Sequence, residues 1–250
     1  MSKIILFDGG NYMFKAIFSY KANPAVPMTY TYCKMLIGDL KKVKVEADDM
    51  IIVAQDFGRS WRKNIDKNYK AQRKAKREDS MPPEQWDEIF KDFNQFFEKL
   101  AQSLPWYFIS VLHCESDDIA SVVSRYYKNK EVILLSSDRD WEMLLSLPNT
   151  KLFSPISKKF KKVPNPMKVL LEKIQGDVSD NLLEKPTSEA EYDKRKKIVD
   201  LIHELPDFVE NAIKDELVHL LPKNLYTHKL PYKSLVADIE KIYKIGEQNA

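Results

Sequence analysis

The sequence predicts an α/β protein with a mostly parallel central sheet, flanked by helices and followed by a helical C-terminal region. Short runs of Val, Ile, Leu and Phe recur and are separated by longer amphipathic stretches, the alternation that characterises α/β domains. The runs are continuous rather than alternating, as expected for strands covered on both faces. We expect strands at residues 3–8, 50–55, 106–112 and 131–136, with a further edge strand at 151–153.

Helices are predicted between and after these strands. Apolar residues at helical spacing mark the first set, at residues 29–44, 84–103, 117–128 and 139–147. No strand is predicted after Pro155, where prolines separate helical stretches at 166–175, 188–204, 207–220 and 232–245. We therefore expect an α/β core over residues 1–155 and a helical region over residues 156–250.

Composition narrows the class of protein. The 250 residues, 44% of them apolar, suffice for one substantial core with a smaller appendage. Cys33 and Cys114 have no zinc-site spacing and imply no disulfide framework. No signal-peptide layout is present, and no apolar run reaches the ~18 residues of a membrane span. We expect a cytoplasmic protein with no membrane partner.

Acidic residues recur where the predicted strands end. The carboxyl ends of parallel strands converge on one crevice, where ligands bind. Two carboxylates 4 Å apart repel each other by about 4 kcal/mol at an effective dielectric near 20, so such a cluster must take up protons or cations. Hard oxygen ligands favour Mg²⁺ or Mn²⁺. The candidate metal ligands are Asp8, Asp56, Glu115, Asp117, Asp118, Asp138, Asp140, Asp177 and Asp180.

A basic segment lies between the second and third predicted strands. Residues 59–77 contain nine Lys or Arg and one acid, with Trp61 and Tyr69 interleaved. Basic and aromatic side chains together suit a phosphate backbone whose bases are free to stack. A second basic run spans residues 158–162. Acidic and basic groups in this layout fit an enzyme that binds nucleic acid and cuts it with metal ions.

Each feature also has a purely structural interpretation. An acid after a strand is often a helix N-cap, and Asp8-Gly9-Gly10 is also a plain turn sequence. A basic run is often a solvated face, and Trp61 and Tyr69 are as compatible with local packing as with base stacking. The coincidence of several acidic strand ends favours a site, whereas Asp48 and Asp49 precede a strand and belong to the far edge.

Five motifs in chain order carry a resemblance to a known family. They read FDGGNYMFKA, AQDFGRSWRKNIDKNYKAQR, ESDDIA, SSDRDWEMLL and IQGDVSDN, and they extend over about residues 3–181. Together they resemble the 5′-nuclease superfamily, which includes flap endonucleases and bacteriophage 5′→3′ exonucleases of the phage ribonuclease H type. The resemblance implies a PIN-like nuclease core over residues 1–155 with a basic helical arch at 59–103. It also implies a modified helix–hairpin–helix in residues 156–250.

The resemblance further implies the chemistry and the partners. Two Mg²⁺ ions, with Mn²⁺ as a substitute, would be held by the nine acids, and Asp138 would be catalytic. Lys70 and Arg73 would act on the scissile phosphate and Tyr69 would stack on a base, with Arg62 and Lys63 also binding substrate. The implied activity is 5′→3′ exonuclease or flap endonuclease on DNA or RNA-primed DNA in replication or repair. The implied protein is a monomer in a bacterial or phage-infected cell, with a single-strand-binding protein or polymerase as partner.

One departure from the family keeps other functions open. The G-D-x-x-D-N motif normally continues into a glycine-rich hairpin, but no glycine occurs between Gly176 and Gly246. A tight hairpin that presents backbone amides to phosphate normally uses glycine. Residues 194–197 are basic and either contact substrate instead or form a solvated helix face. The alternatives are a PIN-type single-strand ribonuclease and a non-catalytic nucleic-acid-binding relative.

Overall fold

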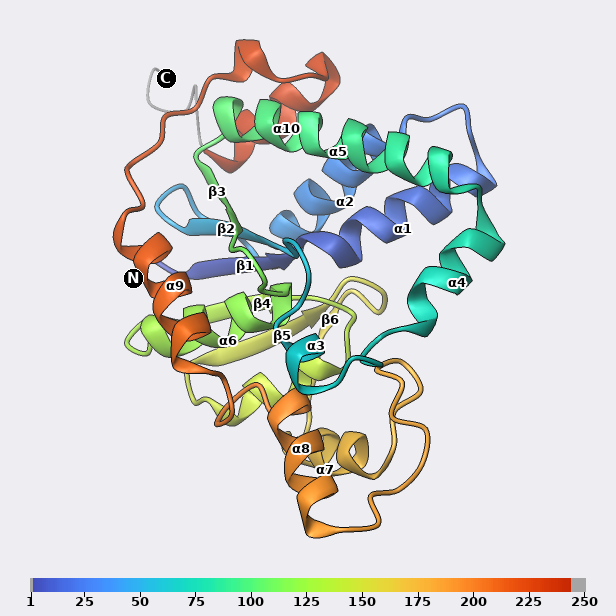
Figure 1. Ribbon diagram of the computed structural model, residues 1–250. Coiled ribbons are helices and arrows are strands. Elements are labelled where there is room, and N and C mark those ends of the chain that lie inside the picture. Colours follow the sequence, from blue (N-terminus) through green and yellow to red (C-terminus); the bar gives the residue numbers. More distant parts are fainter. Residues whose placement is uncertain (1, 244–250) are drawn as a thin grey trace.

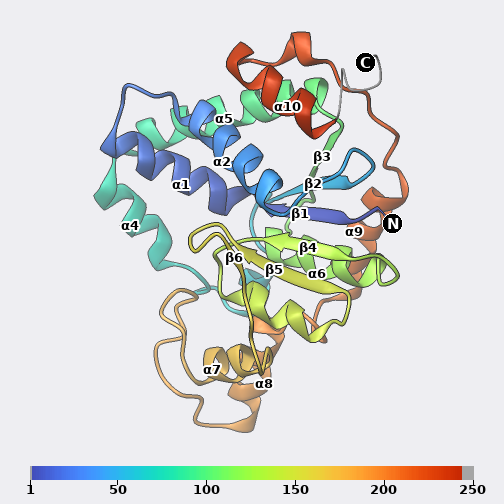
Figure 2. The same cartoon turned by 180° about the vertical axis from the view of Figure 1, so that it is seen from behind.

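The computed structural model describes residues 2–243 and contains one six-stranded sheet (Figure 1, Figure 2). The strand order is β3-β2-β1-β4-β5-β6, with every pairing parallel except that of β5 and β6. The strands are β1 (Ile4–Asp8), β2 (Met50–Gln55), β3 (Trp106–Ser110), β4 (Val132–Leu135), β5 (Thr150–Ser154) and β6 (Lys159–Phe160). The predicted fold class and the first five strands are confirmed.

The central strand explains why the acids meet at one edge. All five residues of β1 are buried, and the strand pairs with β2 on one side and β4 on the other. The registers align Asp8 with Ala54 and Phe7 with Leu135, so these three strands end at the same level. Parallel strands with both faces covered are apolar throughout, and the first polar residue therefore appears where the strand leaves the core.

One face of the sheet is covered by an aromatic-rich cluster. Its helices are α1 (Gly9–Ala22), α2 (Met28–Lys42), α5 (Pro83–Ser103) and α10 (Val236–Ile242), which lie together above the sheet in Figure 1. The Tyr32 ring lies 5.8 Å from that of Phe93 and 5.3 Å from that of Phe97. Leu235, Ile239 and Ile242 also join this cluster, so the end of the described chain packs against helices from its first half.

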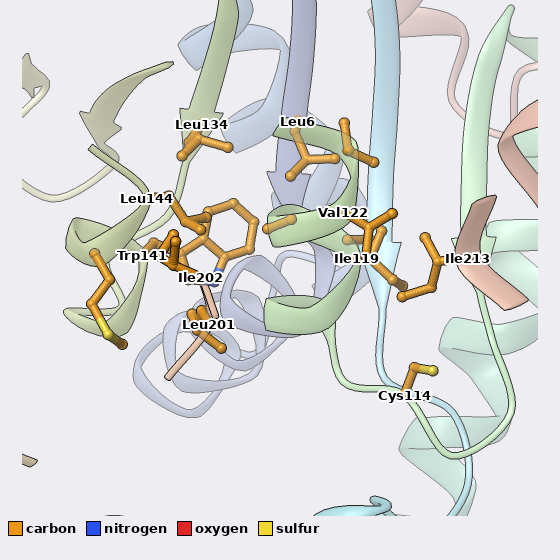
Figure 3. Packing of buried hydrophobic residues seen from close by; sticks show 14 of the residues in the cluster. Leu6, Cys114, Ile119, Val122, Leu134, Trp141, Leu144, Leu201, Ile202 and Ile213 are labelled. Carbon is orange, nitrogen blue, oxygen red and sulfur yellow. The ribbon is translucent and has the colours of Figure 1, made fainter. Parts of the chain in front are cut away.

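The other face is covered by helices that follow β3. They are α6 (Ser116–Tyr126), the 3₁₀ helix η1 (Asp140–Ser146), α7 (Lys168–Gln175), α8 (Glu189–Val199) and α9 (Asp207–Val218). Figure 3 shows part of this cluster, in which Leu6 and Leu134 come from the sheet, Val122 from α6 and Trp141 from η1. In the described part of the chain, no helix combines the length and apolarity needed to cross a membrane.

Several elements differ from the prediction. Helix α1 was not predicted, because its Gly-Gly start gives no helix signal. Residues 159–160 form β6, so the absence of strands after Pro155 was wrong. Helix α5 packs on the sheet, so within the predicted arch residues 59–82 form the connection from β2 to α5, through α3 (Arg62–Ile65) and α4 (Gln72–Ser80). We call residues 59–82 the crossing segment.

The C-terminal region is not a separate body. Helix α9 packs against α6, and α10 packs against α2. Helices α7 and α8 pack together and are joined by residues 176–188, which lack a glycine hairpin and contain one isolated bridge between Asp177 and Leu182. The helix predicted at 232–245 begins later, and its last two residues lie outside the described ones.

Candidate active site

Asp8 lies at the buried carboxyl end of β1. Its Oδ1 accepts a hydrogen bond from the backbone N–H of Asn11 at 3.0 Å, which caps α1, and its Oδ2 accepts one from the Ser136 hydroxyl at 2.7 Å. Gly9 follows because a Cβ there would lie 2.7 Å from the Ala54 carbonyl oxygen. Burial, with smaller contributions from the nearby charges of Asp138 and Asp56, raises the pKa of Asp8 to about 7.

Asp56 and Asp117 belong to two different segments that meet beside Asp8. Asp56 follows β2 and accepts a 2.7 Å hydrogen bond from the backbone N–H of Ser116, the first residue of α6. Asp117 lies in the first turn of α6 and accepts a 2.7 Å hydrogen bond from Nε1 of Trp141. Burial raises the pKa of both carboxyls, with contributions from Glu115 to Asp56 and from Asp138 to Asp117.

Asp138 completes a group of four acids around the ends of β1, β2 and β4. Its Oδ1 accepts a 3.0 Å hydrogen bond from the backbone N–H of Asp140, which fixes the loop after β4. In residues 2–243, none of these four carboxylates forms a salt bridge with a Lys or Arg side chain. We call Asp8, Asp56, Asp117 and Asp138 the unpaired carboxylates.

Asp118, a predicted metal ligand, and Arg62, a predicted substrate-binding residue, form a buried ion pair with each other. The Arg62 side chain is 2% exposed, and its guanidinium donates to Asp118 Oδ1 at 2.7 Å, Glu115 Oε2 at 3.0 Å and the Ile198 carbonyl at 2.7 Å. Asp118 Oδ2 also accepts from Trp61 Nε1 and from the Glu115 backbone. In this structure both side chains are therefore engaged with neighbouring groups, and their predicted functional roles stay predictions. Neighbouring Lys63 is half-buried.

Tyr69, which the resemblance implies as a base-stacking residue, is buried in this structure. Its ring is 3% exposed and its hydroxyl donates to Glu115 Oε2 at 3.0 Å. Lys70 Nζ donates to Glu115 Oε1 at 2.7 Å. Burial raises the pKa of Glu115, but the charges of Lys70 and Arg62 outweigh it and lower the pKa to about 2. Glu115 is therefore ionised, and its hydrogen bonds to Tyr69 and Lys70 hold the crossing segment in place.

A second group of acids surrounds one lysine. Lys173 Nζ lies 2.9 Å from Asp177 Oδ2 and 2.7 Å from Asp180 Oδ2, and it also contacts Asp140 Oδ2. Burial, opposed by Lys173, raises the pKa of Asp140 to about 6. We call Asp140, Lys173, Asp177 and Asp180 the Lys173 cluster. Sequence reasoning missed Lys173, although a lysine on the apolar face of α7, four residues before Asp177, was a usable signal.

Arg73 lies at the rim between the two groups. Its side chain is half exposed, and NH2 lies 3.8 Å from Asp180 Oδ1. That oxygen is buried and accepts no hydrogen bond within residues 2–243. Lys70 Nζ lies 4.0 Å from the same oxygen. Two cationic side chains of the crossing segment therefore border the acids.

A cleft opens beside Asp56. It has a volume of about 660 Å³ and lies between α1, α4 and α5. Five phenylalanines and one arginine of the crossing segment are among its lining residues: Phe14, Phe57, Phe90, Phe97, Phe108 and Arg77. We call it the aromatic cleft. Its residues come from five separate segments of the chain, which is why sequence reasoning did not assemble it.

The acidic side chains at the sheet edge do not form a preformed metal site. Across residues 2–243, no three acidic, Cys or His side chains stand close enough to hold an ion without rearrangement. The raised pKa values of Asp8, Asp56 and Asp117 nevertheless show that burial and mutual repulsion disfavour their charges, and a cation would relieve this. The charge and oxygen donors of the unpaired carboxylates therefore suit a divalent ion, although the side chains are not preformed as its ligands, and the Lys173 cluster already contains a cationic group.

Comparison with known proteins decides the family. The profile of the 5′-3′ exonuclease N-terminal resolvase-like domain matches residues 3–174. The chain belongs to this family. The resemblance to the 5′-nuclease superfamily is thus confirmed. Ribonuclease H of Enterobacteria phage T4 is 27% identical to this 5′-3′ exonuclease family member over 151 residues, which cover 58% of this chain and 49% of the relative. The chain spans about half the length of that curated relative.

Solved structures confirm the fold of this family member. The T5 D15 protein crystallised with metal ions has a TM-score of 0.64 at 18% identity, covering 86% of this chain and 98% of its own. T5 5′-exonuclease with bound zinc has a TM-score of 0.59 at 21% identity, and the match covers 97% of this chain and 90% of the T5 chain. The T5 D15 flap endonuclease complex with DNA and metal ions has a TM-score of 0.60 at 21% identity, and the match covers 96% of this chain and 89% of the T5 chain.

The raised pKa values predict how metal-free stability depends on pH. The pKa of Asp8 is about 7 in the folded chain and about 3.9 in an unfolded one. The folded state therefore binds the Asp8 proton more tightly than the unfolded state does. The resulting contribution to the free energy of unfolding is fully present below about pH 4 and is lost as the pH rises through about 7. Because metal ligands must be deprotonated, we expect Mg²⁺ to raise the melting temperature more at about pH 8 than at about pH 5.5. Thermal melts with EDTA or MgCl₂ measure this, and an equal gain at both pH values would contradict it.

Proposed function

We propose that this protein is a divalent-metal-dependent 5′ nuclease, a 5′→3′ exonuclease or flap endonuclease acting near the 5′ ends of DNA or RNA-primed DNA. The observation that carries the proposal is the set of four unpaired carboxylates at the carboxyl edge of the sheet, beneath a basic segment. Two of them, Asp8 and Asp117, are buried, and buried acids without cationic partners are costly unless they bind an ion or a proton. Family membership and the metal-containing structures of the T5 proteins support the same conclusion.

Mg²⁺, with Mn²⁺ as a substitute, would be held by Asp8, Asp56, Asp117 and Asp138. When bound, such an ion lowers the pKa of a coordinated water and polarises a phosphoryl oxygen. The chain's own groups complete the site. Glu115 holds Lys70 at the edge of the acids, where its ammonium is placed to neutralise charge on a phosphate. Arg73, half exposed at the rim, offers a bidentate guanidinium to the next phosphate.

The aromatic cleft indicates how a single strand would approach. Phe57 is 52% exposed in the lining, and Asp56 stands at its edge. Bases stack on aromatic faces irrespective of sequence, and Arg77 adds a cation for the backbone. A 5′ end or flap would therefore pass between α1, α4 and α5 toward the unpaired carboxylates. The crossing segment, rather than the whole range 59–103, would form the arch over this strand.

The biological setting is part of the proposal. The T4 relative is a phage ribonuclease H and one T5 structure contains DNA, which supports a replication or repair role on DNA or RNA-primed substrates. A monomer in the cytoplasm of a bacterial or phage-infected cell, working beside a single-strand-binding protein or polymerase, is consistent with this role. The loop at 176–188 lacks a glycine hairpin, so its duplex contacts would be made by side chains.

A cleavage assay on three labelled substrates tests the proposal. We expect Mg²⁺-dependent release of short 5′ products from a 5′-labelled flap and from a nicked duplex, and slower cleavage of single-stranded RNA. Affinity for the flap should fall steeply with salt, with a log–log slope near −0.7 to −0.9 per phosphate contacted. Preferential cleavage of the RNA would favour a PIN-type ribonuclease. Tight, salt-sensitive binding without cleavage in Mg²⁺ or Mn²⁺ would favour a non-catalytic relative.

A further inference from the structure

We propose that the ammonium group of Lys173 takes the place of a second divalent cation, so that the protein binds one metal ion rather than two. The inference rests on the proposed metal-dependent function and specifies its metal content. The sequence predicts two ions because nine acids fall in the metal motifs. The structure divides those acids into groups with different charge partners.

The contacts of Lys173 match what an ammonium group can satisfy. Its three N–H donors face three carboxylates, those of Asp140, Asp177 and Asp180. These acids come from η1 and from the turn after α7, so the amine joins two separate segments of the chain. The single positive charge at that point offsets part of the negative charge that a divalent ion would otherwise compensate.

The geometry of α7 holds the amine in place. Val169, Leu170, Lys173 and Ile174 are the buried residues of this helix and form its inward face. The Lys173 stem therefore leaves the helix between apolar neighbours, and its side chain is only 7% exposed. Lys168 on the same helix is 67% exposed. The Lys173 ammonium therefore cannot reach solvent unless the aliphatic part of the side chain leaves the packed face of α7.

The unpaired carboxylates, unlike the Lys173 cluster, have no cationic partner among the described residues, and this difference indicates where a metal ion would bind. Asp8, Asp56, Asp117 and Asp138 have no salt-bridge partner in the described part of the chain. A second divalent ion at the Lys173 cluster would lie beside a buried ammonium and be repelled by it. One ion at the unpaired carboxylates meets no such competitor.

Mn²⁺ titration of the full-length protein tests the inference, with free Mn²⁺ followed by electron paramagnetic resonance in the absence of nucleic acid. We expect the wild type to bind one ion per chain. Lys173→Met keeps the stem volume and removes the charge, and we expect it to bind two. Lys168→Met, on the exposed side of the same helix, is the matched control and should bind one. Circular dichroism would verify that each variant is folded.

The outcomes separate this inference from the proposed function. Two ions on the wild type would show that Lys173 moves aside, and the inference would be overturned even if Lys173→Met did not fold. One ion on a folded Lys173→Met would show that the three acids form no second site, which also overturns it. No Mn²⁺ bound to the wild type would reject the metal-dependent function and the inference with it.

Discussion

The Asp138→Asn variant should lose more than about 100-fold in Mg²⁺-dependent hydrolysis, exceeding the loss typical when only an outer partner of a metal ligand is altered. Asp138 belongs to the unpaired carboxylates, and an amide removes one negative charge from the group that would hold the ion. Asn keeps a side-chain oxygen, so it can still accept the hydrogen bond from the Asp140 backbone N–H. Flap binding measured without divalent metal should therefore be retained, while single-turnover cleavage collapses.

Asp193→Asn is the matched control for this experiment. Asp193 is exposed on α8, away from the sheet edge, and the same chemical change there should leave cleavage unaltered. If Asp138→Asn cleaved at the wild-type rate, Asp138 would have no part in the metal site. If both variants lost activity equally, the effect would be one of net charge rather than of coordination.

Replacing Arg62 with methionine is expected to lower the free energy of unfolding by about 3–5 kcal/mol, the cost of breaking a buried ion pair from one side. The guanidinium donates to Asp118, to Glu115 and to the Ile198 carbonyl, and so joins three separate groups. Its removal leaves Asp118, which is fully buried, without a counter-charge. Urea denaturation in EDTA, followed by circular dichroism, measures the loss without contributions from bound metal.

Two comparisons make the Arg62 result specific. Lys63→Met removes a positive charge from the next residue, which is half-buried, and should change stability by less than about 0.5 kcal/mol. Adding Asp118→Asn to Arg62→Met should restore part of the lost stability, because the two side chains interact directly. A loss below about 1 kcal/mol for Arg62→Met would show that Glu115 and Asp118 find other compensation.

The strands and the positions of the acids were predictable because both depend on local sequence. A continuous apolar run identifies a buried parallel strand, and the residue at its end, such as Asp8, marks the sheet edge. What the sequence does not show is the partner of each charge. Arg62 pairs with residues more than fifty positions away, and nothing near it distinguishes this arginine from Arg73, which stays half exposed.

Local sequence also does not show which surroundings each aromatic side chain has. Tyr69 lies in a basic segment, where stacking on a base is a reasonable expectation, yet its hydroxyl is used to fix Glu115. The aromatic side chains that do face a cleft, such as Phe57 and Phe90, lie outside the dense part of that segment. Their common location arises from the crossing of α1, α4 and α5, a tertiary arrangement that periodicity along one helix does not encode.

The return of α10 to the first half of the chain bears on how the protein is made. Leu235, Ile239 and Ile242 complete the same apolar cluster as α2 and α5, and the Tyr232 hydroxyl is hydrogen-bonded to Thr29. During synthesis, the sheet can pair long before these residues leave the ribosome, but one of its faces stays incompletely covered until they do. Contacts between such distant segments form late and slowly, and a nascent chain with exposed apolar surface is prone to aggregate. Emergence of residues 232–242 from the ribosome is thus expected to complete the cover of this face of the sheet.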